Sequence, residues 1–210
     1  MSIILKTCSG SGFKYVIGKR NESISFYLDK ISHKNLGISQ VYGSKPERIL
    51  EWLSSRYLLT SIMDNAEHII FDYDKYGKPF ILGSDKFISI SHSDEMLAAA
   101  VSDYKIGIDI ERSSNRTVRV KEKFASQNDL AFLNDENEMM FLTRLWTVKE
   151  AVYKAYGKKG IDFKEQINLI SENECVLNLE NSLKLSYKLH SELIEDYFFT
   201  VAYQKNSENE

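Results

Sequence analysis

The chain has few cysteines, no long apolar run and no surplus of positive charge, and each absence removes a class of protein. Its two cysteines, Cys8 and Cys175, lie far apart without CxxC spacing, which argues against a disulfide framework and against a thiolate zinc site. No run approaches the roughly 20 apolar residues of a membrane span, and the opening MSIILKTCSG lacks the apolar core of a signal peptide. We therefore expect reduced thiols and a cytoplasmic protein with no membrane partner.

The charge balance is close to neutral, with 27 basic and 30 acidic residues and a formal net charge of -3 over 210 residues. General nucleic-acid binders usually carry a basic surplus, so we expect no nucleic-acid partner. Any anion site must then come from a local cluster of cations. With 43% hydrophobic residues, the chain can fill one sizeable core or two small ones.

Two segments show strong helical patterns. The first begins at Ser44, with a proline in its first turn and Glu47 three residues after the serine, an arrangement typical of a capping box. The second runs from Glu138 to Tyr156 with apolar residues at helical spacing, and Gly157 is placed to end it in a left-handed turn. A shorter helical piece, SQNDLAFLN, is expected before the second helix.

Short apolar runs occupy most of the remaining chain and predict strands. Because tight polar turns join several of them, they favour antiparallel hairpins over parallel crossovers. The predicted strands are GFKYVIG, SISFYLD, EHIIFDYD, KPFIL, FISISH, LAAAVS, IGIDIE, INLIS, CVLNLE, SLKLSYKLH and YFFTVAYQ.

The order of these elements predicts an α+β fold of two similar halves, each with a long helix packed on a mainly antiparallel sheet. The first half would span residues 1–111 and end with the strand IGIDIE, and the second would span residues 112–210. Polar and basic RSSNRTVR is the expected linker, and residues 204–210 are expected to form a frayed tail.

The run IGIDIE places two carboxylates in an otherwise apolar strand. Its three isoleucines share one face, while Gly107, Asp109 and Glu111 share the other, where the glycine leaves space beside the acids. The acids could be turned to solvent or paired with the arginines that follow. Two adjacent like charges repel unless they share a cation, and a third acid, Glu150, would complete an oxygen site for a hard divalent cation such as Mg²⁺.

The second predicted helix carries Trp146, Glu150 and Lys154 at spacings of four, so their side chains line up beside the apolar stripe. A Glu–Lys pair of this kind is common on helix surfaces and has no function by itself. Trp146 is expected to pack against the helix rather than to stack on a ligand.

Three basic side chains that precede the acids are candidates for holding an anion. Arg56 lies in the first helix, Lys78 follows a glycine, and His92 ends a predicted strand. Ser91 and Ser93 flank the histidine, and their hydroxyls could donate to a phosphate oxygen. An isolated histidine is more often structural, and a serine triad has poor support because no Gly-x-Ser-x-Gly surrounds either serine.

In this order, GKPF, ISISHS, GIDIE and WTVKEAVYKAYG resemble the motifs of the 4'-phosphopantetheinyl transferase superfamily. The length and the two halves look like the surfactin-synthetase-activating type, whose single chain is a pseudodimer, so a monomer is expected. The resemblance implies Mg²⁺-dependent transfer of the 4'-phosphopantetheine arm of coenzyme A to a serine of an acyl or peptidyl carrier protein, with release of adenosine 3',5'-bisphosphate. Fatty-acid, polyketide and peptide synthesis remain alternatives for the pathway served.

The resemblance also implies roles for individual residues. Asp109, Glu111 and Glu150 match the magnesium-binding acids, and Glu150 is also the candidate base. Lys154 matches the lysine beside the pyrophosphate and is the second candidate catalytic residue. The positions matched to the nucleotide end of coenzyme A are Arg56, Lys78 and His92, with Ser91 beside the histidine, and Lys34 or Lys45 as possible additions.

Two other functions stay open at this level. The chain could be a non-catalytic module that binds coenzyme A or a carrier protein with the same fold, which predicts binding without turnover. It could also be a metal-dependent phosphohydrolase that uses the same acids, which predicts product release from coenzyme A without any acceptor.

Overall fold

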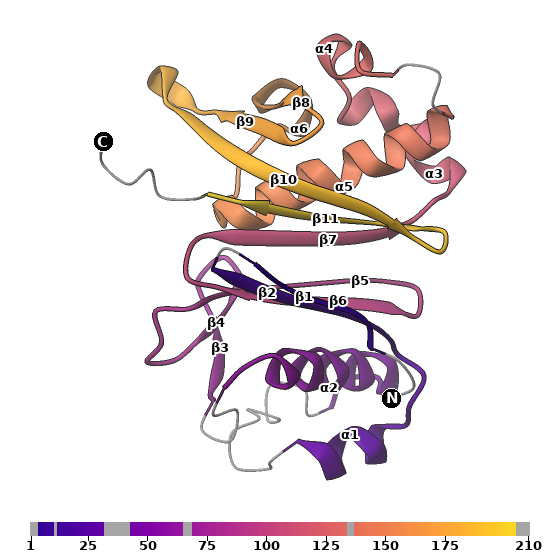
Figure 1. Cartoon of the computed structure of the whole chain (residues 1–210), viewed down its shortest axis with the longest axis vertical. Coiled ribbons are helices and arrows are strands. Elements are labelled where there is room, and N and C mark those ends of the chain that lie inside the picture. Colours follow the sequence, from indigo (N-terminus) through magenta and orange to yellow (C-terminus); the bar gives the residue numbers. More distant parts are fainter. Residues whose placement is uncertain (1–3, 11, 32–42, 65–68, 134–136, 205–210) are drawn as a thin grey trace. The chain divides into compact units, whose positions relative to one another are not determined.

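We describe a computed structural model of the chain over residues 4–10, 12–31, 43–64, 69–133 and 137–204 (Figure 1). The chain divides into two compact units, Met1–Asp103 and Tyr104–Glu210. Each unit combines helices with an antiparallel sheet, which confirms the α+β class predicted from the sequence. Within the described ranges, no helix is long and apolar enough to cross a membrane.

The first unit is built on an antiparallel sheet with strand order β1-β2-β6-β5. Helix α2 (Pro46–Ser61) packs on strands β2 and β6, and helix α1 (Ile24–Lys30) packs on α2 (Figure 1). Leu58 and Leu59 of α2 meet Val16 and Ala99 of the sheet in a buried core. The strands of this unit are β1 (Ile4–Gly10), β2 (Phe13–Lys19), β3 (Phe71–Tyr73), β4 (Pro79–Ile81), β5 (Phe87–Ser93) and β6 (Met96–Ser102), of which β3 and β4 form a separate hairpin.

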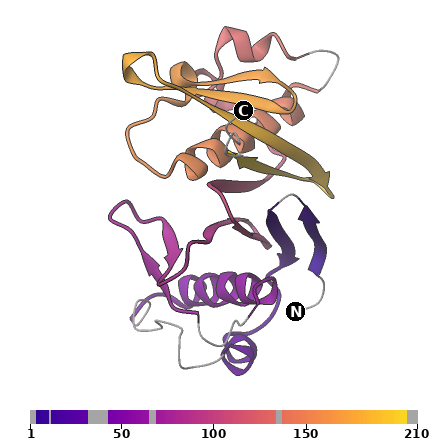
Figure 2. The same ribbon diagram turned by 60° about the vertical axis from the view of Figure 1, so that its left-hand side comes forward.

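The second unit is built on an antiparallel sheet with strand order β7-β11-β10-β9-β8. Helix α5 (Glu138–Tyr156) lies against β7, β11 and β10 (Figure 2). The strands are β7 (Ile106–Arg112), β8 (Ile167–Ser171), β9 (Glu174–Asn178), β10 (Lys184–Ile194) and β11 (Tyr197–Tyr203). The shorter helices are α3 (Asn115–Val120), α4 (Gln127–Leu130) and α6 (Phe163–Gln166), with 3₁₀ turns at Lys121–Lys123 and Glu180–Ser182.

Helix α5 has the bounds that its sequence predicts. Asn137 caps its beginning, because the side-chain oxygen accepts hydrogen bonds from the amides of Met139 and Met140. Gly157 ends it at φ 73°, a left-handed conformation that glycine adopts without steric cost.

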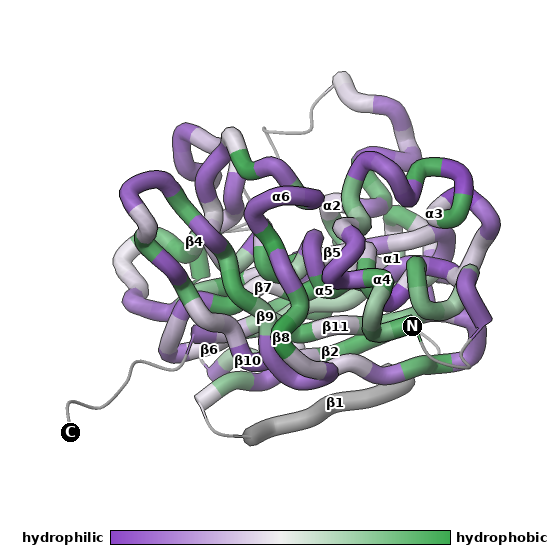
Figure 3. Tube along the Cα trace, turned by 90° about the horizontal axis from the view of Figure 1, so that it is seen from above, coloured by the Kyte–Doolittle hydropathy of each residue, from purple (hydrophilic) through white to green (hydrophobic). Residues whose placement is uncertain are grey.

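Hydrophobic residues follow the strands that the helices cover. In Figure 3, green stretches run along strands such as β8, whereas purple dominates α6 and many connecting turns. The buried thiol of Cys175 belongs to the core of the second unit, where burial raises its pKa to about 12 and so disfavours the reactive thiolate. The side chain of Cys8 lies outside the described part of the chain.

The predicted strand SISFYLD is wrong, because this segment forms helix α1. Ser23 caps the helix through its side-chain oxygen, which accepts from the amide of Phe26. The rings of Phe26 and Tyr27 then pack on Tyr57 of α2, with centroid distances of 6.0 and 5.7 Å. These aromatic contacts stabilise the helical form of a segment whose residue types would also suit a strand.

The start of α2 also differs from the prediction. The helix begins after Lys45 rather than after Ser44, so the capping box does not form, and no side-chain cap bond is present at Lys45. Strand β1 was not predicted from the sequence; it joins the sheet through pairing with β2.

The expected boundary between the halves differs from the division of the structure. The chain divides between Asp103 and Tyr104 rather than after residue 111. Strand β7 pairs with β11 over its whole length, so IGIDIE belongs to the second unit. RSSNRTVR contains most of helix α3, which packs on α5, and it is therefore part of the second unit rather than a linker.

Candidate active site

Strand β7 and helix α5 meet at Gly107. A Cβ atom added at this glycine would lie 2.0 Å from the carbonyl oxygen of Ala151 and 2.4 Å from the amide nitrogen of Ala155, both in the helix backbone. The absence of a side chain therefore lets the helix backbone lie directly on the strand. The expectation that this glycine leaves space beside the acids is wrong, because the helix occupies that space.

The close approach brings the acids of β7 to helix α5. Ile106, Ile108 and Ile110 are fully buried on one face of the strand, as predicted. On the other face Asp109 is only 5% exposed, so it is not turned to solvent, and the next acid along, Glu111, is half-buried. The strand is thus buried on both of its faces around Asp109.

Lys154 of α5 holds Asp109 directly. Its ammonium group donates a hydrogen bond to Oδ1 of Asp109 at 2.7 Å, and the two side chains are 29% and 7% exposed. A charge-assisted hydrogen bond in such a sheltered place is stronger than one at the surface. It fixes the register between the strand and the helix at the point where the acids gather.

Glu150 lies one helical turn before Lys154 and feels the same acids. Burial and the negative charge of Asp109 raise the pKa of the Glu150 carboxyl from 4.5 to about 7. Glu111 contributes in the same direction, while Lys154 opposes the rise. A carboxyl whose pKa lies near neutral pH can exchange a proton at that pH, and a bound cation would relieve the repulsion among the three acids.

The three carboxylates have the donor chemistry of a site for a hard divalent cation. Oxygen ligands suit Mg²⁺, and the mutual repulsion felt by Glu150 shows that the acids share one electrostatic environment. Within the described ranges, however, no three His, Cys, Asp or Glu side chains are already grouped as a metal site. Oδ1 of Asp109 is instead held by Lys154, so a cation bound by these acids would compete with the lysine for Asp109.

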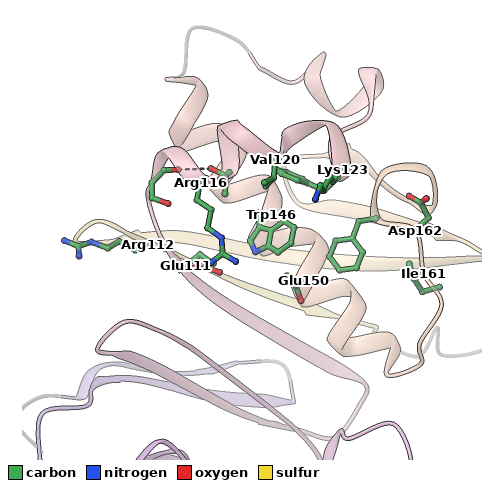
Figure 4. Close-up of a pocket in the computed structure, with 13 residues that line it drawn as sticks. Glu111, Arg112, Arg116, Val120, Lys123, Trp146, Glu150, Ile161 and Asp162 are labelled. Carbon is green, nitrogen blue, oxygen red and sulfur yellow. Dashed lines mark hydrogen bonds between the residues drawn. The ribbon is translucent and has the colours of Figure 1, made fainter. Parts of the chain in front are cut away.

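A pocket of about 490 Å³ opens beside the acids and contains Glu111 and Glu150 in its lining (Figure 4). One side of it is aromatic. Trp146 packs edge-on against Phe124, with ring centroids 5.1 Å apart, and lies 5.8 Å from Phe163. Trp146 thus packs against its own unit, as predicted, and also forms part of the pocket wall.

The same pocket contains cations that were not predicted as site residues, although the sequence offered the arginines after IGIDIE as partners for the acids. Arg112, Arg116 and Lys123 line it, and Figure 4 shows the side chain of Arg116 extending toward Trp146 and Glu111. The signal was present in the basic RSSNRTVR, which we interpreted as a linker. Because α3 packs on α5, this segment instead faces the acids.

The predicted anion-binding residues lie in the first unit. Arg56 and His92 line a pocket of about 510 Å³ together with Lys45 and Arg48. Lys45 was considered as an addition, whereas Arg48 was not predicted.

Arg56 is more deeply buried than an exposed anion ligand would be. Its side chain is only 3% exposed, and its guanidinium group lies 4.2 Å from the ring centre of Trp52. One terminal nitrogen donates to the hydroxyl of Tyr73 at 2.5 Å, and the other donates to Ser55 at 3.0 Å. Burial lowers the pKa of Arg56. Only an anion inside this pocket could reach this guanidinium group.

His92 already has an acidic partner in this pocket. Its Nε2 lies 2.7 Å from a carboxylate oxygen of Glu51, and both side chains are about 40–45% exposed. Glu51 also lines the pocket, so a carboxylate competes there with any incoming anion.

The other predicted anion ligands do not line this pocket or lie outside the described residues. Ser91 is buried at 5% exposure, and Lys78 is half-buried; neither is among the residues that line this pocket. Lys34 lies outside the described residues. The structure therefore brings Arg56, His92 and Lys45 together in one unit, and Asp109, Glu111, Glu150 and Lys154 together in the other.

Comparison with known proteins identifies the family. Residues 105–202, which contain this acidic site, match the family model of the 4'-phosphopantetheinyl transferase superfamily. The chain belongs to this superfamily. The resemblance of its motifs is thereby confirmed.

Relatives in this superfamily support the assignment. The chain is 37% identical over 111 residues to 4'-phosphopantetheinyl transferase gsp of Aneurinibacillus migulanus, over 51% of this chain and 46% of that protein. It is 32% identical over 144 residues to 4'-phosphopantetheinyl transferase Sfp of Bacillus subtilis strain 168, over 67% of this chain and 59% of that protein. For 4'-phosphopantetheinyl transferase HetI of a Nostoc species, identity is 33% over 141 residues, or 59% of this chain and 58% of that protein. The matched part of the chain thus spans about half of each relative's length.

Proposed function

We propose that this member of the superfamily transfers the 4'-phosphopantetheine arm of coenzyme A to a serine of an acyl or peptidyl carrier protein, as a monomer of the surfactin-synthetase-activating type. The observation that carries the proposal is the meeting of Asp109 and Glu150 at the contact between β7 and α5, with Lys154 bonded to Asp109. Such a group can bind and stabilise the charge that develops when a pyrophosphate bond breaks.

Each residue of the acidic group has a distinct part in the proposed reaction. Asp109, Glu111 and Glu150 would hold Mg²⁺, which when bound neutralises charge on the pyrophosphate oxygens. Lys154 would move from Asp109 to donate a hydrogen bond to the leaving phosphate, because its ammonium group can satisfy either anion. Glu150 would also accept the proton of the acceptor serine, which is a weak nucleophile while its hydroxyl is intact.

The aromatic side of the pocket beside the acids suits the arm. Pantetheine is long, uncharged and amphipathic, and the wall formed by Trp146, Phe124 and Phe163 offers it aromatic contacts. Arg56, His92 and Lys45 are proposed to hold the nucleotide end of coenzyme A, with Lys78 and Ser91 as supporting residues. This division of roles follows the chemistry of a donor that is charged at one end only.

The proposal is tested by incubating the protein with Mg²⁺, coenzyme A and a panel of apo carrier proteins from fatty-acid, polyketide and peptide synthesis. Intact-protein mass spectrometry should show the mass of the arm on a carrier serine, and chelation of the metal should stop the transfer. A carrier whose acceptor serine is replaced by alanine is the matched control. Coenzyme A binding without transfer to any carrier would support a binding module instead, and breakdown of coenzyme A without a carrier would support a phosphohydrolase.

A further inference from the structure

Helix α5 carries a lysine on its apolar stripe. Lys149 follows Leu142 and Leu145 and precedes Val152 at the spacing of core positions, and it is completely buried like them. A buried ammonium group is costly unless it is paired and hydrogen-bonded, so the contacts of this side chain reveal what it does.

The ammonium group of Lys149 has three hydrogen-bond acceptors from three segments. It donates to Oδ2 of Asp129 at 2.6 Å, to the carbonyl oxygen of Phe163 at 2.8 Å and to the carbonyl oxygen of Ile167 at 2.6 Å. A lysine ammonium group has three donors, so every donor is used. Helix α5 is thereby tied to α4 and to both ends of α6.

Asp129, the acidic member of the ion pair, is also held by several hydrogen bonds. Its Oδ2 also accepts from the amide and the hydroxyl of Ser126, and its Oδ1 accepts from the amide of Leu169. Both members of the pair are buried, with side-chain exposures of 1% for Lys149 and 0% for Asp129. The pair is therefore a rigid junction rather than a loose surface contact.

The segment that Lys149 holds forms a wall of the pocket beside the acids. Between the end of α5 and the start of α6 the chain has no regular secondary structure, and Ile161 and Asp162 of this stretch line the pocket together with Phe163, the first residue of α6. The adjoining part of this wall comes from Trp146 and Glu150 of α5, which lie within one turn of Lys149, and the ring of Trp146 lies 5.8 Å from that of Phe163. One ammonium group thus joins the two segments that form this wall.

Burial of an ion pair is a weak way to stabilise a protein, because apolar residues of similar volume often stabilise the same place equally well. What apolar residues cannot do is bind two backbone carbonyls at set distances. We propose that Lys149 is a positioning residue, whose bonds to the carbonyl oxygens of Phe163 and Ile167 hold the Ile161–Phe163 segment against Trp146 and so keep the pocket wall in the shape that the substrate arm requires. The proposal rests on the proposed function for its kinetic readout only.

Three variants separate the carbonyl contacts from the ion pair. Lys149→Met removes both, while Asp129→Asn removes the charge of the pair and leaves the ammonium donors for the two carbonyls. The double variant Lys149→Met/Asp129→Asn removes both charges of the pair and so, like the wild type, has no buried net charge. It differs from the wild type in lacking the hydrogen bonds to the two carbonyl oxygens. Asp129→Asn is therefore the matched control for Lys149→Met.

The first readout is the emission of Trp146, whose ring lies 5.8 Å from that of Phe163. The chain has two tryptophans, so these spectra are recorded in a Trp52→Phe background, where the replaced residue lies in the first unit. We expect acrylamide to quench Trp146 more strongly in Lys149→Met and in the double variant, because the wall moves away from it. Quenching in Asp129→Asn should match that of the parent, although its melting temperature falls.

The second readout is transfer kinetics, measured with Trp52 intact. A wall displaced by about 1 Å can cost up to roughly 100-fold in rate, so we expect kcat/KM to fall at least about tenfold in Lys149→Met and the double variant. The kcat/KM of Asp129→Asn should stay within about threefold of the wild-type value, which is a smaller change than a displaced wall would cause.

The proposal is overturned if the double variant has the quenching and kinetics of the wild type, or if all three variants change in parallel with their melting temperatures. Failure of the double variant to fold would also overturn it, because the role of the pair would then lie in folding. If the wild-type protein shows no transfer, the proposed function fails, and Trp146 quenching alone still decides the positioning role.

Discussion

Glu150 makes the metal-free protein sensitive to pH in a direction that the structure predicts. Its pKa is raised from 4.5 to about 7, mainly by burial and then by the charge of Asp109. Between these two values the folded state keeps a proton that the unfolded state has released. The contribution of Glu150 to stability is therefore fully present below about pH 4.5 and is lost as the pH rises to about 7.

The size of the effect follows from the same pKa values. One pH unit corresponds to about 1.4 kcal/mol, so the rise from 4.5 to about 7 sets an upper limit of about 3 kcal/mol. Glu150 is only half-buried, and solvent screens part of the repulsion, so we expect a measured loss of about 1 to 2 kcal/mol.

The measurement is urea unfolding of the wild type and of Glu150→Gln, in chelator, from pH 4.5 to pH 7. Trp146 fluorescence in the Trp52→Phe background follows the second unit, which avoids mixing the transitions of the two units. The stability of the wild type relative to Glu150→Gln should fall across this range, because all other titrating groups are common to both. At pH 7, Mg²⁺ should stabilise the wild type more than the variant, since a ligand that binds only the folded state raises its stability. A constant difference between the two proteins at every pH would refute the reasoning.

Three further predictions test other parts of the site. Gly107→Ala places a Cβ 2.0 Å from the carbonyl oxygen of Ala151, so it should lower the free energy of unfolding by about 1 to 3 kcal/mol or more and also impair transfer; unchanged urea curves would show that the helix can move aside at no cost. Glu51→Gln removes the carboxylate beside His92 and should tighten the binding of adenosine 3',5'-bisphosphate by about threefold to tenfold in calorimetry, as expected for one neutralised like charge near a surface; weaker binding would show instead that Glu51 orients the histidine. Asp109→Asn should abolish Mg²⁺-dependent transfer while the circular dichroism spectrum stays that of the wild type, because the amide keeps an acceptor for Lys154; near-normal activity would remove Asp109 from the metal site.

Local patterns in the sequence predicted the elements whose signals repeat along the chain. Helix α5 shows helical periodicity over five turns and ends at a glycine, so its bounds could be predicted. The alternation in IGIDIE predicted the buried isoleucine face of β7. The short segment SISFYLD was ambiguous, because its spacing suits either a strand or one helical face, and only contact with Tyr57 of α2 decided it.

The sequence by itself determined the chemical identity of the site. The motifs that carry the acids, the lysine and the basic residues resemble those of the superfamily in type and order. Such a resemblance can be found in the sequence before the fold is known. Tertiary structure alone decided which of them meet. The contact of Gly107 with α5, the hydrogen bond from Arg56 to Tyr73 and the three hydrogen bonds of Lys149 all join separate elements of the fold. Such contacts depend on how folded elements pack, which leaves no periodic signal in the sequence.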